Sequence, residues 1–120
     1  MEGMNYQSLT KYMCLLVVMF VSGVWSVHGA VPPLERSALV ALYEATDGDY
    51  WTSNDNWLVG DPCDNSWFGI SCDLGNTTVV QIALDDNGLS GSIPSELGNL
   101  SNLQLLNFFF NNFLFLKVVH

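Results

Sequence analysis

The sequence contains very few basic residues. Three of its 120 residues are lysine or arginine, against twelve aspartate and glutamate residues, and the formal net charge at pH 7 is −9. Nucleic-acid phosphates and anionic lipid headgroups are bound mainly through clustered lysine and arginine. The composition therefore excludes nucleic acid as a partner, and it excludes electrostatic attachment to an anionic membrane surface.

The sequence also lacks an apolar run long enough to span a bilayer, which requires about 20 residues. The apolar stretch 13–25 is preceded by Lys11 and followed by small residues, which is the layout of a secretory signal. We predict a signal peptide over residues 1–29, cleaved after Gly29 or Ala30, and a secreted, possibly cell-surface protein. The alternative is an uncleaved signal anchor, because the segment before the apolar stretch is long and carries a glutamate.

Cysteine and histidine are scarce. Cys14 lies in the predicted signal, which leaves Cys63 and Cys72 in a chain destined for an oxidising compartment. Two cysteines allow one pairing, so we predict a Cys63–Cys72 disulfide worth about 2 to 3 kcal/mol in the chain-entropy model. The alternative, a metal site, requires further ligands at short spacing, and none lies nearby. We expect no metal and no cofactor.

Apolar residues between Leu34 and Ala45 recur at intervals of three and four, which predicts an amphipathic helix of about three turns. Prolines directly before it suit a first helical turn. The helix should stop near Thr46, with Gly48 supplying the left-handed cap.

Residues 47–69 hold three tryptophans among Asn, Asp, Gly and Pro. This composition predicts a loop that folds over a core and buries its indole rings. Two short extended segments follow, at 69–73 and 79–84, and the turn-forming residues 74–76 lie between them. We therefore predict a β-hairpin.

A 24-residue repeat begins at Val79. Five apolar or asparagine positions recur, and the pairs are Val79/Leu103, Ile82/Leu106, Leu84/Phe108, Asn87/Asn111 and Leu89/Phe113. The spacing L-x-x-L-x-L-x-x-N-x-L is the signature of a leucine-rich repeat. One coil cannot cover its own apolar face, so successive coils must stack. The residues expected to face this shared interior are Ile82, Leu84, Leu97 and Leu106.

Residues 41–106 resemble the N-terminal cap and first repeat of plant-type extracellular leucine-rich repeat proteins. The cap pattern P-C-x(n)-W-x-G-I-x-C matches residues 62–72, and the repeat pattern N-x-L-x-G-x-I-P-x-x-L-G-x-L matches residues 87–100. The resemblance implies an α/β solenoid, in which a helix, a Trp-rich loop, a disulfide and a β-hairpin form the cap. About 1.5 repeats follow this cap. The implied segments are a cap at 30–78, a first repeat at 79–102 and an incomplete, divergent second repeat at 103–120.

The match ends in the second repeat. Gly91 should recur at 115 and Ile93-Pro94 at 117–118, but the sequence has Phe115, Lys117 and Val118 there. We interpret this end as a truncation or a break in the gene model. A hydrophobic C-terminal anchor is the alternative, but its apolar residues are too few to span a bilayer. Contact with a membrane would then come only through an uncleaved signal or a missing C-terminal region.

Proteins with such modules include plant receptor-like kinases, receptor-like proteins and small secreted inhibitors of microbial wall-degrading enzymes. The resemblance implies that outward-facing strand residues form a concave surface that binds a protein or peptide. The residues assigned to this surface are Gln81, Ala83, Asp85, Asp86, Gln104 and Asn107. Stacked strands lie about 4.8 Å apart, so Asp85 should face Phe109, and Asp86 should face Phe110. We predict an extracellular protein- or peptide-binding module; the alternative is a small secreted inhibitor or structural wall protein acting on its own.

Asp85 and Asp86 could also be interpreted as the paired carboxylates of a glycoside hydrolase. Adjacent strand residues point to opposite faces, however, and nothing in the sequence raises the pKa of either group. We therefore expect no enzymatic activity. Two N-x-S/T sequons, at Asn76 and Asn99, lie in predicted exposed turns, and we expect both to be glycosylated.

Overall fold

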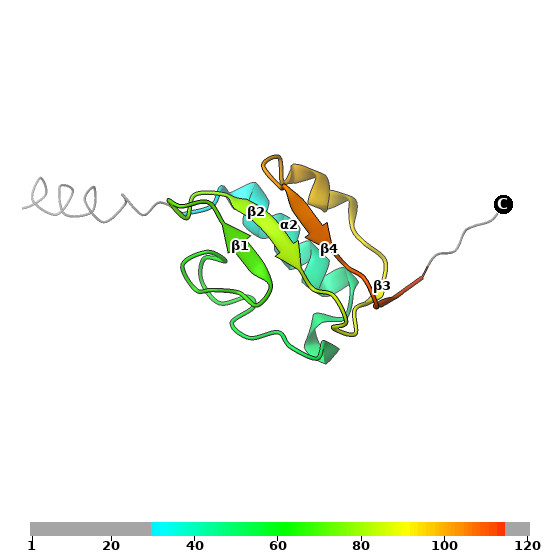
Figure 1. Cartoon of the computed structure of the whole chain (residues 1–120). Helices are drawn as coiled ribbons and strands as arrows, with labels where there is room; N and C mark the ends of the chain where they lie inside the picture. The colour runs from blue at the N-terminus through cyan, green and yellow to red at the C-terminus, as the bar shows by residue number, and fades with distance from the viewer. Residues whose placement is uncertain (1–29, 115–120) are drawn as a thin grey trace, which may run out of the picture.

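The computed structural model describes residues 30–114, which fold as a small sheet with a helix packed behind it (Figure 1). The predicted signal peptide and residues 115–120 lie outside the described residues. Within the described part, no helix is both long and apolar enough to cross a bilayer. The elements in chain order are α2 (Pro33–Ala45), η2 (Gly48–Tyr50), β1 (Ile70–Cys72), β2 (Val79–Ala83), β3 (Ser90–Gly91), η3 (Ser95–Asn99), β4 (Leu105–Asn107) and β5 (Asn112–Phe113).

Helix α2 begins and ends close to where the apolar spacing predicts. Pro33 occupies the first turn, where a missing N–H costs nothing, and the helix stops at Thr46, whose N–H and hydroxyl both donate to the Leu42 carbonyl. The predicted left-handed cap is wrong by one residue, because Asp47 adopts φ 59° and Gly48 does not. Glycine is required at 48 for a different reason, since a Cβ there would collide with the Tyr43 ring.

A buried glutamate ties the start of α2 to the sheet. Glu35 Oε1 accepts the Val79 N–H at 2.8 Å, and Oε2 accepts the Thr78 hydroxyl at 2.7 Å. Asn102, which lies 24 residues after Thr78, donates to the same Thr78 oxygen at 3.0 Å. The sequence had indicated only a favourable helix-dipole position for Glu35, whereas the structure shows that its carboxylate links the helix to the start of β2, and that Thr78 passes the connection on to Asn102.

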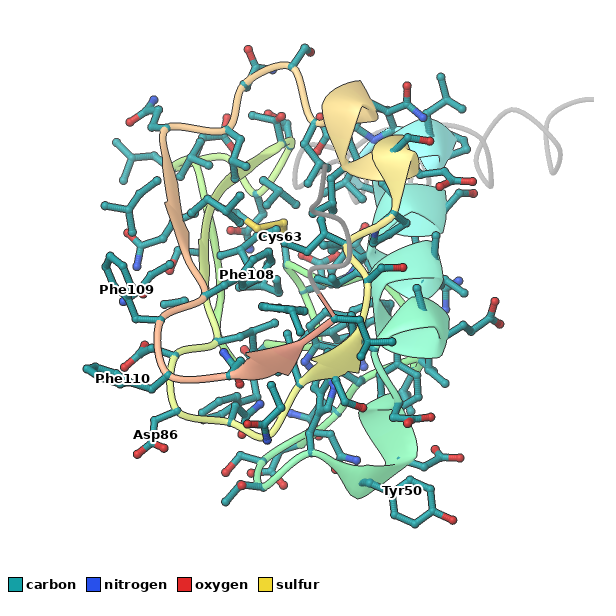
Figure 2. The ribbon with its side chains drawn as sticks, turned by 90° about the vertical axis from the view of Figure 1, so that its right-hand side faces the viewer. Tyr50, Cys63, Asp86, Phe108, Phe109 and Phe110 are labelled. Atoms are coloured by element: carbon teal, nitrogen blue, oxygen red, sulfur yellow. A yellow bond between two sulfur atoms is a disulfide. The ribbon has the colours of Figure 1, made fainter. Side chains whose placement is uncertain are left out.

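The predicted disulfide is confirmed. Cys63 bonds to Cys72 with a Cα–Cα distance of 5.9 Å, and it joins the tryptophan-containing loop to strand β1 (Figure 2). The same loop is held from the helix by Arg36. This side chain donates to the carbonyls of Leu58 and Gly60 at 3.0 and 2.8 Å, and its guanidinium lies 5.2 Å from the centre of the Trp67 ring.

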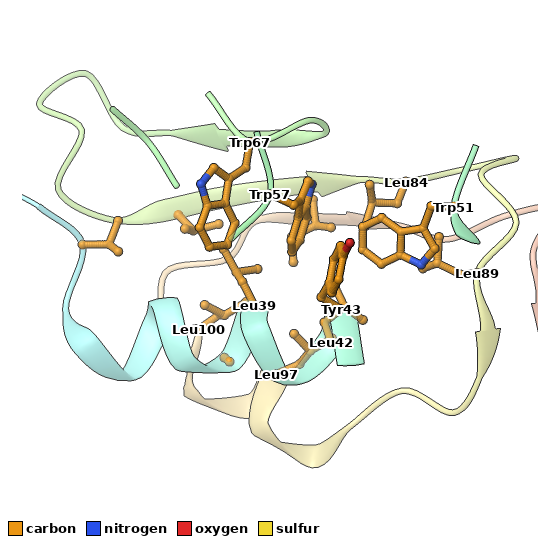
Figure 3. Packing of buried hydrophobic residues seen from close by; sticks show 14 residues of the cluster. Leu39, Leu42, Tyr43, Trp51, Trp57, Trp67, Leu84, Leu89, Leu97 and Leu100 are labelled. Atoms are coloured by element: carbon orange, nitrogen blue, oxygen red, sulfur yellow. The ribbon is translucent and has the colours of Figure 1, made fainter. Parts of the chain in front are cut away.

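The tryptophan-containing loop folds over the core, as its composition predicts (Figure 3). Trp51, Trp57 and Trp67 are all buried. Trp57 is the middle ring, with centroids 4.9 Å from Trp51 and 5.0 Å from Trp67. Each indole N–H donates to a backbone carbonyl at 2.8–3.0 Å, so no indole N–H is buried without a hydrogen-bond partner.

The sheet has the order β1-β2-β4. Strands β1 and β2 form the predicted antiparallel hairpin, with Ile70 opposite Ile82 and an irregularity between Ser71 and Cys72. Strand β4 is parallel to β2 and pairs Ile82 with Leu106. This 24-residue offset confirms the repeat period inferred from the sequence.

Two asparagines, 24 residues apart, form hydrogen bonds that join each coil to the segment before it. Asn87 is buried, and its side-chain amide exchanges two hydrogen bonds with the backbone of Ser53, at 2.8 and 2.9 Å. Asn111, which lies 24 residues later, accepts the N–H groups of Asn87 and Leu89 and donates to the Leu84 carbonyl. Each asparagine therefore satisfies backbone groups left open by the preceding segment, as the spacing predicts.

A second, shorter ladder has a different offset. Strand β5 is parallel to β3 and pairs Gly91 with Phe113, which is 22 residues away rather than 24. Asn111 keeps the 24-residue offset from Asn87, so the offset changes by two residues directly after this asparagine.

Three of the four residues expected in the shared interior are buried there, namely Ile82, Leu84 and Leu97. Leu106 departs from the expectation and is 46% exposed. It lies opposite Ile82 on β4, and β4 is an edge of the sheet among the described residues. A side chain on the last coil has a neighbour on one side only, so its inward direction does not bury it.

The hairpin turn gives a prediction about pH. Asp73 accepts the N–H and hydroxyl of Thr77, both at 2.6 Å, and these bonds lower the pKa of its carboxyl. A lowered pKa means that ionised Asp73 stabilises the turn at neutral pH, and that this contribution is lost as the pH falls through the lowered pKa. An NMR titration should place the Asp73 midpoint below the ordinary aspartate value, and Thr77→Val should raise it. Equal midpoints in the two proteins would contradict this assignment.

Candidate functional site

The six residues predicted for the concave surface lie along β2, β4 and the turns beside them. Gln81 and Ala83 alternate with buried Ile82 on β2, and Ala83 pairs with Asn107 on β4. Asp85 and Asp86 follow β2 and are exposed, and Gln104, just before β4, is exposed as well. The backbone bond from Gln104 N–H to the Val80 carbonyl, at 2.8 Å, fixes this edge of the ladder.

Asp86 and Phe110 occupy equivalent points of the two coils. They lie 24 residues apart, and both have left-handed backbones, with φ of 50° and 60°. The Asp86 N–H donates to the Phe109 carbonyl at 2.8 Å, which sets the two turns side by side. Asn107 acts within its own coil, because its Oδ1 accepts the Phe109 N–H at 3.0 Å and holds the turn that carries both phenylalanines.

The two phenylalanines were expected to face Asp85 and Asp86 but were not assigned to the binding set, and both are largely exposed. Phe109 is 72% exposed and Phe110 is 84% exposed, and their ring centroids are 6.3 Å apart. Figure 2 shows both rings and Asp86 projecting from the sheet side of the molecule, away from the core, whereas Phe108 turns inward. The signal was present in the sequence, since the 24-residue period places these large apolar residues at outward positions.

The charge around this surface is almost entirely negative. Residues 30–114 contain eleven carboxylate side chains and one basic residue, Arg36. The Arg36 guanidinium is engaged by the Trp67 ring and two loop carbonyls. No basic side chain in this part of the chain is therefore placed to neutralise Asp85 and Asp86.

Residues 30–114 contain no histidine and no cluster of potential metal ligands. The surface instead presents amides, carboxylates and aromatic rings. These groups form hydrogen bonds and stacking contacts, which is the chemistry of recognition.

A hollow with a volume of about 250 Å³ lies at the end of α2. Exposed Tyr50 marks it in Figure 2, on the opposite side of the molecule from Phe109 and Phe110. Burial, together with a 2.7 Å hydrogen bond to Asp49, raises the pKa of the Tyr43 hydroxyl in its wall. The neutral hydroxyl joins the end of α2 to η2, which is a structural role. The lining residues are Tyr43, Glu44, Asp47, Gly48, Asp49 and Tyr50.

The two sequons both lie in turns or short helices at the surface. Asn76 is half-buried in the hairpin turn with φ 56°, and its Nδ2 lies 3.4 Å from Asp64 Oδ1. Asn99 is the last residue of η3 and is exposed. The amide nitrogen of Asn99 is the more accessible of the two.

Comparison with known proteins points to one group. A probable leucine-rich repeat receptor-like protein kinase of Arabidopsis thaliana is 36% identical over 93 residues, which is 78% of this chain and 9% of that protein. The Arabidopsis protein STRUBBELIG-RECEPTOR FAMILY 2 is 36% identical over 80 residues, covering 67% of this chain and 11% of that protein. A leucine-rich repeat receptor-like serine/threonine-protein kinase of the same plant is 32% identical over 105 residues, covering 82% and 17%.

The chain thus spans between about a tenth and a sixth of the length of these relatives. No family model matches the sequence. Among solved structures, a leucine-rich repeat protein from Bacteroides thetaiotaomicron aligns with a TM-score of 0.46 and 26% identity, over 61% of this chain and 10% of that protein.

Proposed function

Because this chain is a leucine-rich repeat protein of the plant type, we propose that it is a non-enzymatic, extracellular recognition module for a protein or peptide. The ligand contacts the outward face of β2 and β4. The observation that carries this proposal is the 24-residue pairing of β2 with β4, which aligns the outward residues of two coils. Its surface residues are Gln81, Ala83, Asp85, Asp86, Gln104 and Asn107.

We further propose that residues 30–78 act as the N-terminal cap, residues 79–102 as the first repeat and residues 103–120 as a divergent second repeat. The buried tryptophans and the Cys63–Cys72 bond support a capping role, because they close the side of β2 away from β4. The kinase activity in the relatives' names is not proposed for this chain, since the matches cover small shares of those proteins.

A selection from a random peptide library displayed on phage tests the binding surface. The secreted protein is the bait, and enriched peptides are measured again on Ala83→Arg, which places a long side chain in the middle of the face. Ser37→Arg adds the same side chain at an exposed position of α2 and is the matched control. We expect Ala83→Arg to weaken binding at least about tenfold, because it removes close contact at the centre of the interface.

The proposal fails if no peptide is enriched, or if the two arginine variants bind the enriched peptides equally well. If Ser37→Arg weakens peptide binding more than Ala83→Arg does, the peptide contacts α2, and the proposal is contradicted as well. Ser37 is exposed and Ala83 is half-buried on the outward side of β2, so the thermal transition of each variant is measured to check that it folds.

An extracellular location is proposed together with N-glycans on Asn76 and Asn99. The disulfide supports it, because such bonds persist in oxidising compartments. The mass of protein secreted from plant cells, before and after enzymatic removal of N-glycans, reports signal removal and occupancy together. Asn99→Gln and Asn76→Gln should each remove one glycan, and an unchanged mass after deglycosylation would exclude the modification.

A further inference from the structure

The aromatic pair Phe109 and Phe110 combines two features that rarely occur together on a free surface. The rings are 72% and 84% exposed, and the Asp86 N–H donates to the Phe109 carbonyl, so the turn that follows β2 lies next to the turn that carries the rings. Exposed apolar groups of this size usually mark an interaction site. The negative charge of the nearby carboxylates favours a partner with a positive charge.

We propose that the Phe109–Phe110 pair, with Asp85 and Asp86, forms a subsite for an arginine or lysine side chain of a peptide ligand. This inference rests on the proposed recognition function and names the chemistry of its ligand. A cation is attracted to the face of an aromatic ring within about 6 Å of the centroid. Two rings with centroids 6.3 Å apart can both contact one planar guanidinium or the stem of a lysine.

Charge complementarity selects this occupant over the alternatives. The described part of the chain carries eleven carboxylates against Arg36, whose guanidinium is already engaged. A second copy would bring the same negative charge to the interface, and an anionic membrane surface would be repelled as well. A basic peptide segment can form cation–aromatic contacts with the rings and is attracted electrostatically by the carboxylates.

The backbone geometry makes the subsite a fixed feature. Asn107 Oδ1 accepts the Phe109 N–H at 3.0 Å, and Asn111 Nδ2 donates to the Phe108 carbonyl at 2.9 Å, so the turn that carries the rings is held from both sides. The Asp86 N–H holds the neighbouring turn to it. A ligand therefore meets rings on a preformed turn, which reduces the ordering cost of binding.

The test uses three acetylated, amidated tripeptides with the secreted protein, namely Gly-Arg-Gly, Gly-Lys-Gly and Gly-citrulline-Gly. Citrulline has nearly the shape of arginine without its charge. NMR shift changes should gather at the Phe109 and Phe110 rings and at the Asp86 amide, with millimolar dissociation constants. The constant for the citrulline peptide should be about 3 to 10 times that for arginine, given the strength of exposed cation–aromatic contacts.

The double variant Phe109→Leu/Phe110→Leu should raise the dissociation constant of the arginine peptide by a similar factor. The surface of this variant remains apolar. Tyr50→Leu removes an exposed ring next to other carboxylates and is the matched control, which should bind unchanged. Equal affinity for arginine and citrulline in the unmodified protein overturns the inference, whatever the double variant does. Shift changes centred on Tyr50, or dimerisation through the ring pair in sedimentation, would overturn it too.

The two proposals fail separately. Library peptides that lose affinity on Ala83→Arg, but contain no basic residue and tolerate the double leucine variant, would leave the recognition function standing and remove the cationic subsite. If the arginine peptide binds at the rings but no library peptide loses affinity on Ala83→Arg, the cationic subsite stands and the proposed recognition surface fails.

Discussion

Trp57→Ala should lower the free energy of unfolding by about 3 to 5 kcal/mol, the range found when large aromatic core residues are truncated to alanine. Trp57 is buried between Trp51 and Trp67, and it also stacks on Tyr43 with centroids 5.8 Å apart. Its indole N–H donates to the Phe68 carbonyl at 2.9 Å. Truncation therefore removes the contacts with three rings and leaves the Phe68 carbonyl without its donor. Urea denaturation measures the loss.

Tyr50→Ala is the control for this substitution. Tyr50 comes from the same stretch of chain but is 83% exposed, so its removal should change stability by less than about 0.5 kcal/mol. If Trp57→Ala leaves too little folded protein to measure, Trp57→Phe keeps a ring in place and should lie between the two. Similar stabilities for Trp57→Ala and Tyr50→Ala would show that the tryptophans do not form the core.

Gly91→Ala should cost about 2 to 5 kcal/mol. Gly91 has φ +82°, a region that strains residues with a Cβ by roughly 1 to 2 kcal/mol. An added Cβ would also collide with the Ala45 carbonyl oxygen at the end of α2, and overpacking of this kind typically costs about 1 to 3 kcal/mol more. The repeat-pattern glycine is thus explained by the close approach of the first coil to the helix.

Gly98 belongs to the same repeat pattern and provides the comparison. No atom lies within 4 Å of a Cβ built at this position, in η3. Gly98→Ala should therefore change stability by no more than about 0.5 kcal/mol. Thermal or urea denaturation of both variants separates the two glycines, and a Gly98→Ala cost as large as that of Gly91→Ala would contradict the explanation from packing.

Local patterns in the sequence predicted the features that depend on spacing. The intervals of three and four gave the bounds of α2, and the 24-residue period gave the Ile82–Leu106 pairing. The asparagine role followed from the same period. These predictions succeeded because each depends on a regular spacing. Residues at equivalent positions of a regular structure have similar surroundings, so the position of one predicts the position of the others.

The features that the sequence did not predict depend on contacts between distant segments. Glu35 bonds to Val79 across 44 residues, and nothing near either residue indicates this. The left-handed residue after α2 is Asp47, and glycine is needed at 48 because the ring of Tyr43, five residues earlier, occupies the space that a Cβ would take. Leu106 matches the repeat pattern but is exposed because β4 is an edge of the sheet among the described residues, and the 22-residue offset at Gly91 is likewise a property of the pairing between coils.

The candidate surface was predicted in part. The period correctly places the turn at Asp86 beside that at Phe109, but the binding set taken from the sequence omitted Phe109 and Phe110. Asn107 was placed in that set, although its side chain also holds the turn that presents the rings. Side chains that hold the turn in place and side chains that would contact a ligand lie on the same stretch of chain. The sequence does not separate them, because the difference lies in the hydrogen bonds that each side chain makes.

The central claim is that two coils pair with a 24-residue offset and so create one shared outward face. NMR scalar coupling across a hydrogen bond tests it most directly, because it reports which carbonyl each amide bonds to. We predict couplings from the Leu84 nitrogen to the Asn107 carbonyl carbon and from the Asp86 nitrogen to that of Phe109. Couplings to carbonyls at another offset, or amides at 84 and 86 that exchange freely with solvent, would contradict the account.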